Sequence, residues 1–281
     1  GKIELLKPVE VLFEGVNIDT YKPLKDFKSN SINLVEMKES FAFLHCGMWL
    51  QGDIGEDRKN IGMMIKVFLE TFKNKVKQPA LLLKVSQGTS SYMGRDAILE
   101  KIEKIKATVK SNRLPSIYLL NGDLTDEEMN ELYNHPKVKA MVSFTKGEGF
   151  GRPLLEFSTV QKPILTTNWS GHTDFLHEEY TSLIGGELTP IHPSAANKWL
   201  LKEASWFTID YPQAGGHMRD IFEDYKKYQV RSKRQAAIST KEFSYGEMKD
   251  LLGERLDELV PKLAKAIELK LPTLSKLPTL K

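Results

Sequence analysis

The order of the apolar segments is the feature that most constrains the fold of this chain. Between residues 41 and 167, short uninterrupted apolar runs alternate with longer segments in which apolar residues recur every three or four positions. The first pattern is typical of strands buried on both faces, and the second is typical of amphipathic helices. Because strands joined through helices pair in parallel, the sequence predicts an α/β fold: a doubly wound, Rossmann-like parallel sheet.

The predicted strands are short apolar runs that end in turn residues, and they span residues 9–13, 41–47, 80–85, 117–120, 139–144 and 163–167. Helices are predicted at residues 60–75, 98–109 and 125–133, the last opened by a capping box at Thr125, and a further helix opens at Pro153. Beyond Ile184 we predict loops at 185–193 and 212–217 and helices at 218–237 and 248–269. Residues 1–265 are assigned to one domain, and residues 266–281, a proline-containing near-repeat, to a disordered tail.

The composition argues against several classes of protein. The 40 Lys and Arg residues nearly balance the 37 Asp and Glu residues, so the net charge of +3 predicts no nucleic-acid partner. We find no apolar stretch that could span a bilayer and no signal-peptide pattern, and the single cysteine, Cys46, fits a reducing compartment. We therefore expect a cytoplasmic protein. The basic residues of 226–234 are interpreted as the solvated face of a helix, with peripheral membrane contact as the alternative.

The segment from Lys146 to Glu156 is rich in residues that suggest chemistry, and it lies where a predicted strand ends and a predicted helix begins. Ligands of open α/β sheets bind at the carboxyl ends of the strands. Three glycines let the backbone approach a ligand, and the start of the helix presents N–H groups to an anion. A diphosphate is the natural occupant, and of the two carboxylates, Glu148 in the loop and Glu156 in the first turn of the helix, one can face a sugar while the other reaches a ribose. The alternative is a glycine-rich turn in which Glu156 only complements its helix dipole.

Glu148 and Glu156 are separated by seven residues, and this arrangement resembles the Glu-seven-residues-Glu motif of glycosyltransferase family 4, whose members have the two-domain GT-B fold. Other stretches resemble the C-terminal domain of that family in the same order: residues 9–23 its opening, 58–60 its phosphate-binding lysine segment, 126–133 its short helix, and 243–248 its closing helix. The resemblance implies the donor-binding half of a retaining glycosyltransferase. Because a strand-like segment follows Gly1 almost at once, we expect an N-terminal acceptor domain or a partner chain to complete the enzyme.

The resemblance also implies roles for the matched residues. Glu148 would contact hydroxyls of the donor sugar, and Glu156 would bind the ribose of a nucleotide sugar. Lys59, assisted by Arg58, would neutralise the leaving diphosphate. The remaining matched residues would surround the donor: Gly149, Phe150 and Gly151 beside the sugar, Pro153 and the amides of Leu154 and Leu155 at the diphosphate, and Asn121 and Gly122 at the base.

Met48 is the clearest departure from the family pattern, because the family often has a phosphate-contacting arginine at this position. Either Arg58 supplies the lost charge or donor binding is weaker. The alternative for Arg58 and Lys59 is a solvated basic pair. Cations at a helix start oppose the helix dipole, and an anion between them would remove that conflict.

The expected mechanism follows from charge. Cleavage of the bond to a nucleoside diphosphate places positive charge on the sugar and negative charge on the departing oxygens, which nearby cations stabilise. The sequence has no Asp-x-Asp triplet and no set of three histidines at metal-ligand spacing, so we predict metal-independent transfer without a cofactor. The resemblance implies that the anomeric configuration is retained, with the acceptor attacking from the face of the leaving group.

Two histidines lie near the predicted strand ends. His172 follows Gly171, whose backbone N–H could border the sugar, and we interpret His172 as structural, with a site role as the alternative. His45 is interpreted as a packed residue. Besides a hexosyltransferase-like enzyme, two other functions stay open: a non-catalytic nucleotide-sugar-binding or scaffolding module, and another GT-B enzyme such as a sugar-nucleotide epimerase.

Overall fold

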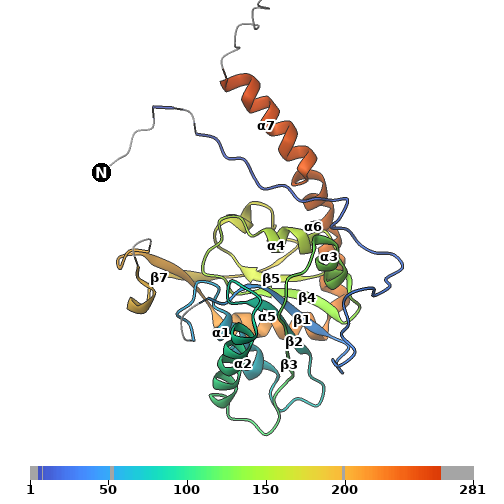
Figure 1. Cartoon of the computed structure of the whole chain (residues 1–281), viewed down its shortest axis with the longest axis vertical. Coiled ribbons are helices and arrows are strands. Elements are labelled where there is room, and N and C mark those ends of the chain that lie inside the picture. The colour runs from blue at the N-terminus through green and yellow to red at the C-terminus, as the bar shows by residue number, and fades with distance from the viewer. Residues whose placement is uncertain (1–5, 8, 51–53, 198–199, 261–281) are drawn as a thin grey trace, which may run out of the picture.

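The computed structural model describes residues 6–7, 9–50, 54–197 and 200–260. Its centre is a six-stranded parallel sheet in the order β3-β2-β1-β4-β5-β6 (Figure 1), with strands β1 (Ala42–Met48), β2 (Ala80–Ser86), β3 (Ile117–Leu120), β4 (Val138–Ser143), β5 (Ile164–Thr167) and β6 (Ser182–Ile184). This confirms the predicted doubly wound α/β fold. The chain runs outward from β1 to β3 and then returns to β4 on the other side of β1, so the order reverses between β1 and β4.

Helices cover both faces of the sheet. They are α1 (Ile61–Phe72), α2 (Tyr92–Ala107), α3 (Asp126–Asn134), α4 (Arg152–Ser158), α5 (Tyr211–Glu223), α6 (Tyr225–Glu242) and α7 (Tyr245–Leu259), with short 3-10 turns η1 (Gly171–Asp174) and η2 (Pro193–Ala195). The predicted capping box is present at Thr125, whose hydroxyl accepts the Glu128 amide while the Glu128 carboxylate accepts the Thr125 amide.

Successive residues of a strand face opposite sides of the sheet, and this divides the apolar residues into two cores. Phe43 and Val142 pack with α1, α2 and α5 on one face. Leu44 and Met141 pack with α3 and α4 on the other, together with Tyr21 from the N-terminal segment. Full burial of each large apolar side chain stabilises the fold by about 1.5–3 kcal/mol, so both faces hold the strand ends rigidly in place.

Several predictions for the ends of the chain are wrong. Residues 9–13 form no strand in this part of the described chain, and Val9 and Val11 are 71% and 82% exposed, because a short apolar run without a neighbouring strand has no ladder to join. The predicted loop at 185–193 contains β7 (Gly186–Pro190), which pairs antiparallel with β8 (Ser205–Ile209). Glycine and proline at the ends of β7 predict a loop when only the neighbouring residues are considered, so the pairing was not expected.

The predicted loop at 212–217 belongs to α5, where Asp210 caps the helix through the Gln213 amide and Pro212 lies in the first turn. The predicted helix at 218–237 is divided between α5 and α6 by Asp224. The last helix begins at Tyr245, earlier than predicted, and is described to Leu259; the predicted continuation at 261–269 and the tail at 266–281 lie outside the described residues.

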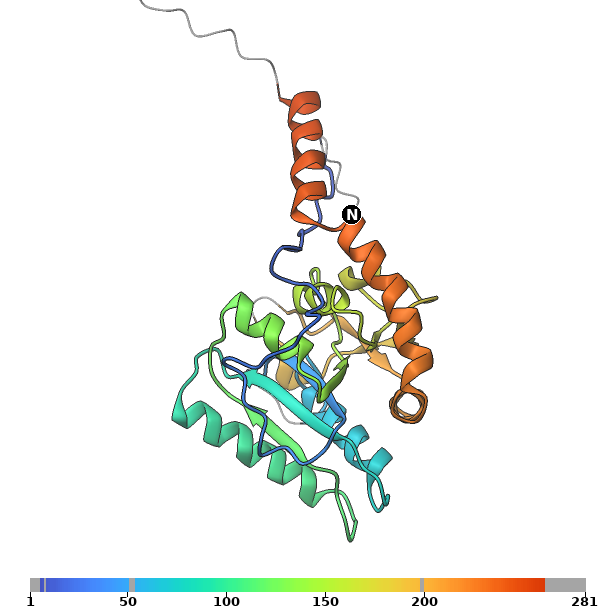
Figure 2. The same cartoon turned by 90° about the vertical axis from the view of Figure 1, so that its right-hand side faces the viewer.

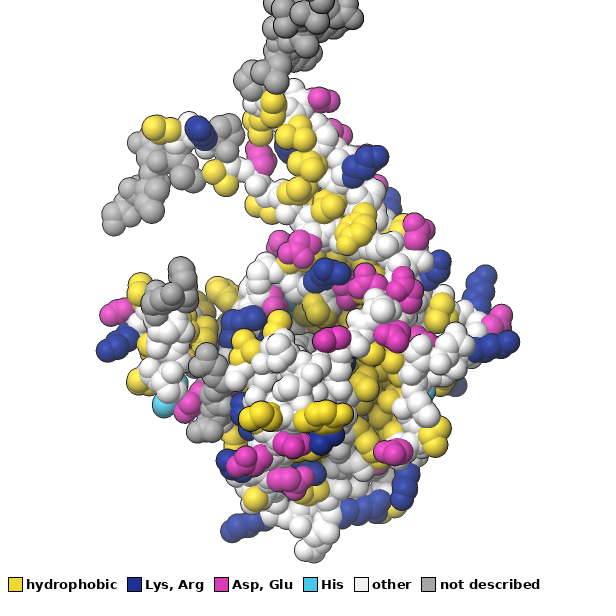
Figure 3. All heavy atoms as spheres, viewed as in Figure 1, with side chains coloured by type: hydrophobic (Ala, Val, Ile, Leu, Met, Phe, Trp, Pro, Cys, Tyr) yellow, Lys and Arg dark blue, Asp and Glu magenta, His cyan; other side chains and the backbone are white. Residues whose placement is uncertain are grey.

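Helix α7 differs from the other long helices. Figures 1 and 2 show it projecting beyond the body of the domain, and none of its residues is buried within the described span 245–259. Figure 3 shows apolar side chains along its surface, where Tyr245, Leu252, Leu256 and Leu259 are 40–50% exposed. In the described parts of the chain, we find no helix with the length and apolar character needed to cross a membrane.

Candidate functional site

The candidate site lies where the strand order reverses, at the carboxyl ends of β1 and β4. Open α/β sheets bind ligands at such reversal points, because the loops there diverge and leave a crevice. The loop after β1 reaches α1 through Asn60, which has a left-handed φ of 56°. The Asp57 carboxylate accepts the Ile61 amide at 3.1 Å and so caps α1. This turn places Arg58 and Lys59 over the end of β4.

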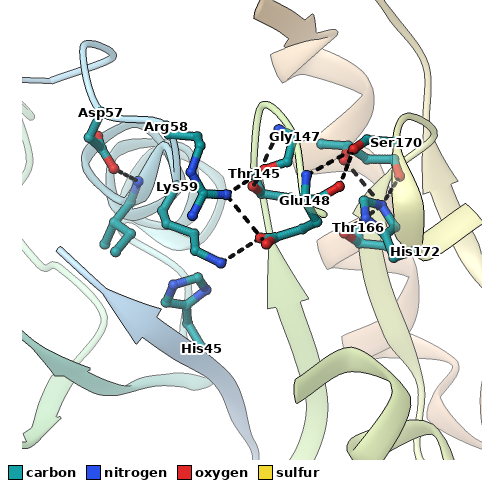
Figure 4. Close-up of polar contacts among 12 residues, drawn as sticks. His45, Asp57, Arg58, Lys59, Thr145, Gly147, Glu148, Thr166, Ser170 and His172 are labelled. Carbon is teal, nitrogen blue, oxygen red and sulfur yellow. Dashed lines mark hydrogen bonds and ion pairs between the residues drawn. The ribbon is translucent and has the colours of Figure 1, made fainter. Parts of the chain in front are cut away.

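Glu148, in the loop after β4, forms ion pairs with both cations. Lys59 Nζ lies 2.5 Å from Glu148 Oε1, and Arg58 Nη1 lies 3.3 Å from Glu148 Oε2 and 2.5 Å from the Gly147 carbonyl oxygen (Figure 4). The Glu148 side chain is 11% exposed and that of Lys59 is 18% exposed. Burial opposes ionisation of Glu148, but Lys59 and Arg58 outweigh it and hold the pKa of the Glu148 carboxyl below its usual value. The structure therefore brings together all three residues predicted to be catalytic.

Backbone contacts from the loop after β5 hold Glu148 in this position. The Glu148 amide donates to Ser170 Oγ at 2.9 Å, and the Ser170 hydroxyl donates to the Glu148 carbonyl. The Gly171 amide also donates to the Glu148 carbonyl, at 3.2 Å, so it does not point freely at a sugar as predicted. A side chain at Gly171 would place its Cβ 2.0 Å from the Gly149 oxygen, and only glycine allows this approach. The contribution of Ser170 was not predicted from the sequence, although it lies beside Gly171.

The first turn of α4 differs from the prediction in one respect. The amides of Leu154 and Leu155 both donate to the Gly151 carbonyl oxygen, at 2.9 and 3.2 Å, so in this structure the helix already uses the two amides expected to meet a diphosphate. Both side chains are buried in the core. Phe150 packs against Phe175, with ring centroids 5.0 Å apart. A Cβ added at Gly149 would meet no atom within 4 Å, which leaves space beside this part of the loop.

Glu156 belongs to a separate network between α4 and α3. Its carboxylate accepts Arg152 Nε at 2.8 Å and the Tyr133 hydroxyl at 3.3 Å. Burial raises the pKa of Glu156 in spite of these partners. Among the described residues, Glu148 and Glu156 have no hydrogen-bond partner in common.

A cavity of about 670 Å³ opens beside the Arg58 and Lys59 cations. Its lining includes Met48, Arg58, Lys59, Pro153, Ala195 and Trp206. The hairpin of β7 and β8 forms one wall and is fixed to the site by Lys146, whose ammonium group lies 4.8 Å from the centre of the Trp206 ring, and by Ser194, whose hydroxyl donates to Glu56 at 2.7 Å. This wall was not predicted from the sequence, because no strand was predicted between residues 185 and 209.

Asn121 and Gly122 lie at the end of β3, two strands from β1. The Asn121 side chain donates to the Val85 carbonyl at 3.1 Å and so joins the ends of β3 and β2. Among the described residues, no hydrogen bond or ion pair connects this turn to the Glu148 cluster.

Both histidines are fully buried. His172 bonds through Nε2 to the Thr167 carbonyl at 2.7 Å, in agreement with the structural interpretation. His45 Nδ1 lies 2.8 Å from the Val142 carbonyl, which joins β1 to β4. Burial lowers the pKa of His45 to about 4 and also lowers the pKa of His172, so both imidazoles are neutral at pH 7.

Comparison with solved structures agrees with this arrangement. The C-terminal domain of a group 1 family glycosyl transferase (LpcC) from Francisella tularensis is similar at 13% identity and a TM-score of 0.55, over 82% of this chain and 100% of that domain. Sucrose-phosphate synthase from Thermosynechococcus elongatus is similar at 15% identity and a TM-score of 0.59, over 88% of this chain and 51% of that one. HepE from Anabaena, in complex with UDP-glucose, is similar at 15% identity and a TM-score of 0.60, over 89% of this chain and 57% of that one.

The chain thus spans about half the length of sucrose-phosphate synthase and of HepE. The fold is that of the C-terminal domain of a GT-B glycosyltransferase. No protein-family model matches the sequence, and no curated protein is similar to it in sequence.

Proposed function

We propose that this chain is the donor-binding half of a glycosyltransferase, which transfers a sugar from a nucleoside diphosphate sugar to an acceptor. One observation carries the proposal: Lys59 and Arg58 converge on Glu148 where the strand order reverses, next to a cavity that both cations line. Cations, a carboxylate and a crevice in this place suit a sugar diphosphate. The likeness to HepE, whose structure contains UDP-glucose, supports this choice of ligand.

Donor binding exchanges the partners of the ion cluster. Lys59 and Arg58 turn their N–H groups to the diphosphate oxygens, and Glu148 accepts hydrogen bonds from sugar hydroxyls. The cluster is poised for this exchange, because the Lys59–Glu148 pair is largely buried while Arg58 is 49% exposed. Pro153 lines the same cavity at the start of α4, and Glu156, in the same helix, binds the ribose.

In the reaction, the bond between the anomeric carbon and the diphosphate oxygen breaks and a bond from the acceptor oxygen to that carbon forms. Lys59 and Arg58 stabilise the negative charge that develops on the leaving oxygen. We propose retention of configuration: the acceptor attacks from the face of the leaving group, and its proton passes to the departing diphosphate oxygen. We also propose that transfer needs no metal ion, since the two cations supply the positive charge.

A second candidate function is a non-catalytic nucleotide-sugar-binding or scaffolding module. Met48 favours it, because this side chain lies at the end of β1, is 54% exposed and lines the cavity without charge. A site with fewer cations could still bind a diphosphate sugar, but it would stabilise the leaving diphosphate less and so favour binding without transfer.

Calorimetry with UDP, GDP, UDP-glucose and GDP-mannose, followed by a transfer assay with the same donors, tests the proposal. We expect one nucleotide to bind and the isolated chain to transfer sugar slowly, because the other half of the crevice is contributed by an acceptor domain. Absence of binding by all four compounds at millimolar concentration would refute donor binding. Binding with no transfer, even when an acceptor half is supplied, would favour the non-catalytic module.

A further inference from the structure

His45 is a buried polar side chain that the proposed reaction leaves without a role. It lies on β1 in the middle of the sheet and is 0% exposed. Because the Val142 carbonyl can only accept, Nδ1 must donate in the 2.8 Å hydrogen bond between them. The neutral ring therefore carries its lone pair on Nε2. This nitrogen is buried and has no hydrogen-bond partner among the described residues, and such an atom is costly to leave unsatisfied.

The free nitrogen lies next to Lys59. Figure 4 shows the His45 ring directly below the end of the Lys59 side chain, where the ammonium group turns to Glu148. The neighbouring Gly47 explains how they approach: a Cβ at Gly47 would lie 3.2 Å from His45 Nε2 and 3.9 Å from Lys59 Cδ. A larger residue at position 47 would separate the imidazole from the lysine chain.

We propose that His45 is a positioning residue: a small shift of the Lys59 side chain lets its ammonium group donate to the unpartnered Nε2 of His45, which then holds Lys59 over the end of β4. The consequence for catalysis rests on the proposed function. A lysine ammonium group has three N–H donors. One of them stays on His45, and the others can pass from Glu148 to the diphosphate oxygens when the donor binds.

The neutrality of the imidazole is what makes it suitable. A second carboxylate at this position would compensate the charge of Lys59 and weaken its attraction for a diphosphate. An apolar residue would leave one ammonium proton without an acceptor in a buried place. His45 satisfies the proton without removing the charge, since burial keeps its pKa far below neutrality.

Nitrogen-15 NMR of histidine-labelled protein tests the contact without any ligand. We expect His45 to be the Nδ1–H tautomer, with an Nε2 resonance shifted by hydrogen bonding. In Lys59→Met that resonance should move towards the position of an unbonded nitrogen, while the signals of His172, which bonds to Thr167, should stay in place. An Nε2 resonance that does not respond to Lys59→Met would overturn the inference, whatever the protein binds.

Binding measurements test the consequence. The variant His45→Gln keeps a donor for Val142 and an acceptor for Lys59, whereas His45→Leu keeps neither. With the nucleotide that the wild type binds, UDP or GDP, we expect Kd to rise about tenfold in His45→Leu and to recover in His45→Gln. In a Lys59→Met background the same His45 changes should alter Kd less than about twofold. Equal losses in both backgrounds, with no rescue by glutamine, would show that His45 is only a packing residue.

If neither nucleotide binds, the proposed function fails, and the NMR result still decides the contact between His45 and Lys59. Thermal unfolding of each variant identifies loss of fold as a separate outcome. Should His45→Leu not fold, the Nε2 resonance of His45 decides: a movement in Lys59→Met towards the position of an unbonded nitrogen supports the contact, and no movement contradicts it.

Discussion

Glu148 and Glu156 belong to one continuous loop and helix, yet their surroundings differ. Glu148 pairs with Lys59 and Arg58 from a loop about 90 positions earlier in the chain, and its pKa is lowered. Glu156 pairs with Arg152 of its own helix and with Tyr133 of α3, and burial raises its pKa. Lys59, Arg58 and Glu148 meet only across the reversal point of the sheet, so a ligand that binds there can separate the cations from the carboxylate. The second group, Glu156 and its partners, joins α4 to α3, and in the proposed function it meets the ribose and not the diphosphate.

The largest expected effect compares the cations of these two networks. Lys59→Met should weaken binding of the nucleoside diphosphate about 100-fold, because it removes the better-buried cation and leaves Glu148 under-paired. Arg152→Met should weaken it less than about threefold, since Arg152 is half exposed and its partner is Glu156. Calorimetry with UDP and GDP measures both, with Lys66→Met on α1 as the control. Similar losses in the Lys59 and Arg152 variants would contradict the division into two networks.

A smaller effect distinguishes the carboxylates themselves. Glu148→Gln should remove most of the affinity difference between a nucleotide sugar and its bare nucleotide, about tenfold, because Glu148 is assigned to the sugar. Glu156→Gln should weaken nucleotide and nucleotide sugar by the same factor, because Glu156 is assigned to the ribose. The ratio of the Kd of UDP to that of UDP-glucose, or the corresponding guanosine pair, reports this. If the Glu156 variant alone changes the ratio, the two assignments must be exchanged.

The difference between the two glutamates also shows what the sequence could predict. The strands from residue 41 to 167 are continuous apolar runs, so their existence and parallel order follow from local pattern and from the rule that helices connect parallel strands. The meeting of Lys59 with Glu148 requires β1 to lie beside β4, and the local pattern did not predict this strand order. The resemblance to a known family added their roles, which the pattern of apolar residues does not contain.

Features that depend on tertiary contacts were not predictable in the same way. The β7 and β8 strands pair across a connection that a local pattern does not reveal, so the Trp206 wall of the cavity was missed. The chain of α5 contains Pro212 and two glycines, which indicate a loop, but Ala214, Met218 and Ile221 pack on the sheet and fix a helix. The use of the Leu154, Leu155 and Gly171 amides within the protein depends on the exact path of two loops.

The opposite pKa shifts of Glu148 and Glu156 predict opposite effects of pH on stability. Because the folded-state pKa of Glu148 is lowered, its ionised carboxylate stabilises the fold at pH values above the usual carboxyl pKa. That stabilisation is lost as the pH falls through the folded-state pKa. A raised folded-state pKa means that the contribution of Glu156 declines as pH rises from the usual range through its folded pKa.

Urea unfolding between about pH 3 and about pH 7 measures this. The stability of the wild type relative to Glu148→Gln should increase with pH over this interval, and its stability relative to Glu156→Gln should decrease. Two differences that change in the same direction would contradict the assigned environments. The control is Glu247→Gln on the exposed helix α7, measured over the same interval.

The smallest expected effect comes from restoring a cation at Met48. This side chain lies at the end of β1, next to Arg58 and Lys59 in the cavity lining, and is half exposed. In Met48→Arg the guanidinium can approach a diphosphate from the β1 side, and an exposed charge pair of this kind should improve affinity about threefold. The gain should fall as salt rises, because solvent screens it. Calorimetry at two salt concentrations, with Met48→Gln as the uncharged control, measures the difference.

If Arg58 already supplies the charge that Met48 lacks, Met48→Arg should not improve affinity in the wild-type background. It should then improve affinity only when combined with Arg58→Gln. Arg58 and an arginine at position 48 would in that case be able to replace each other in the Glu148 cluster.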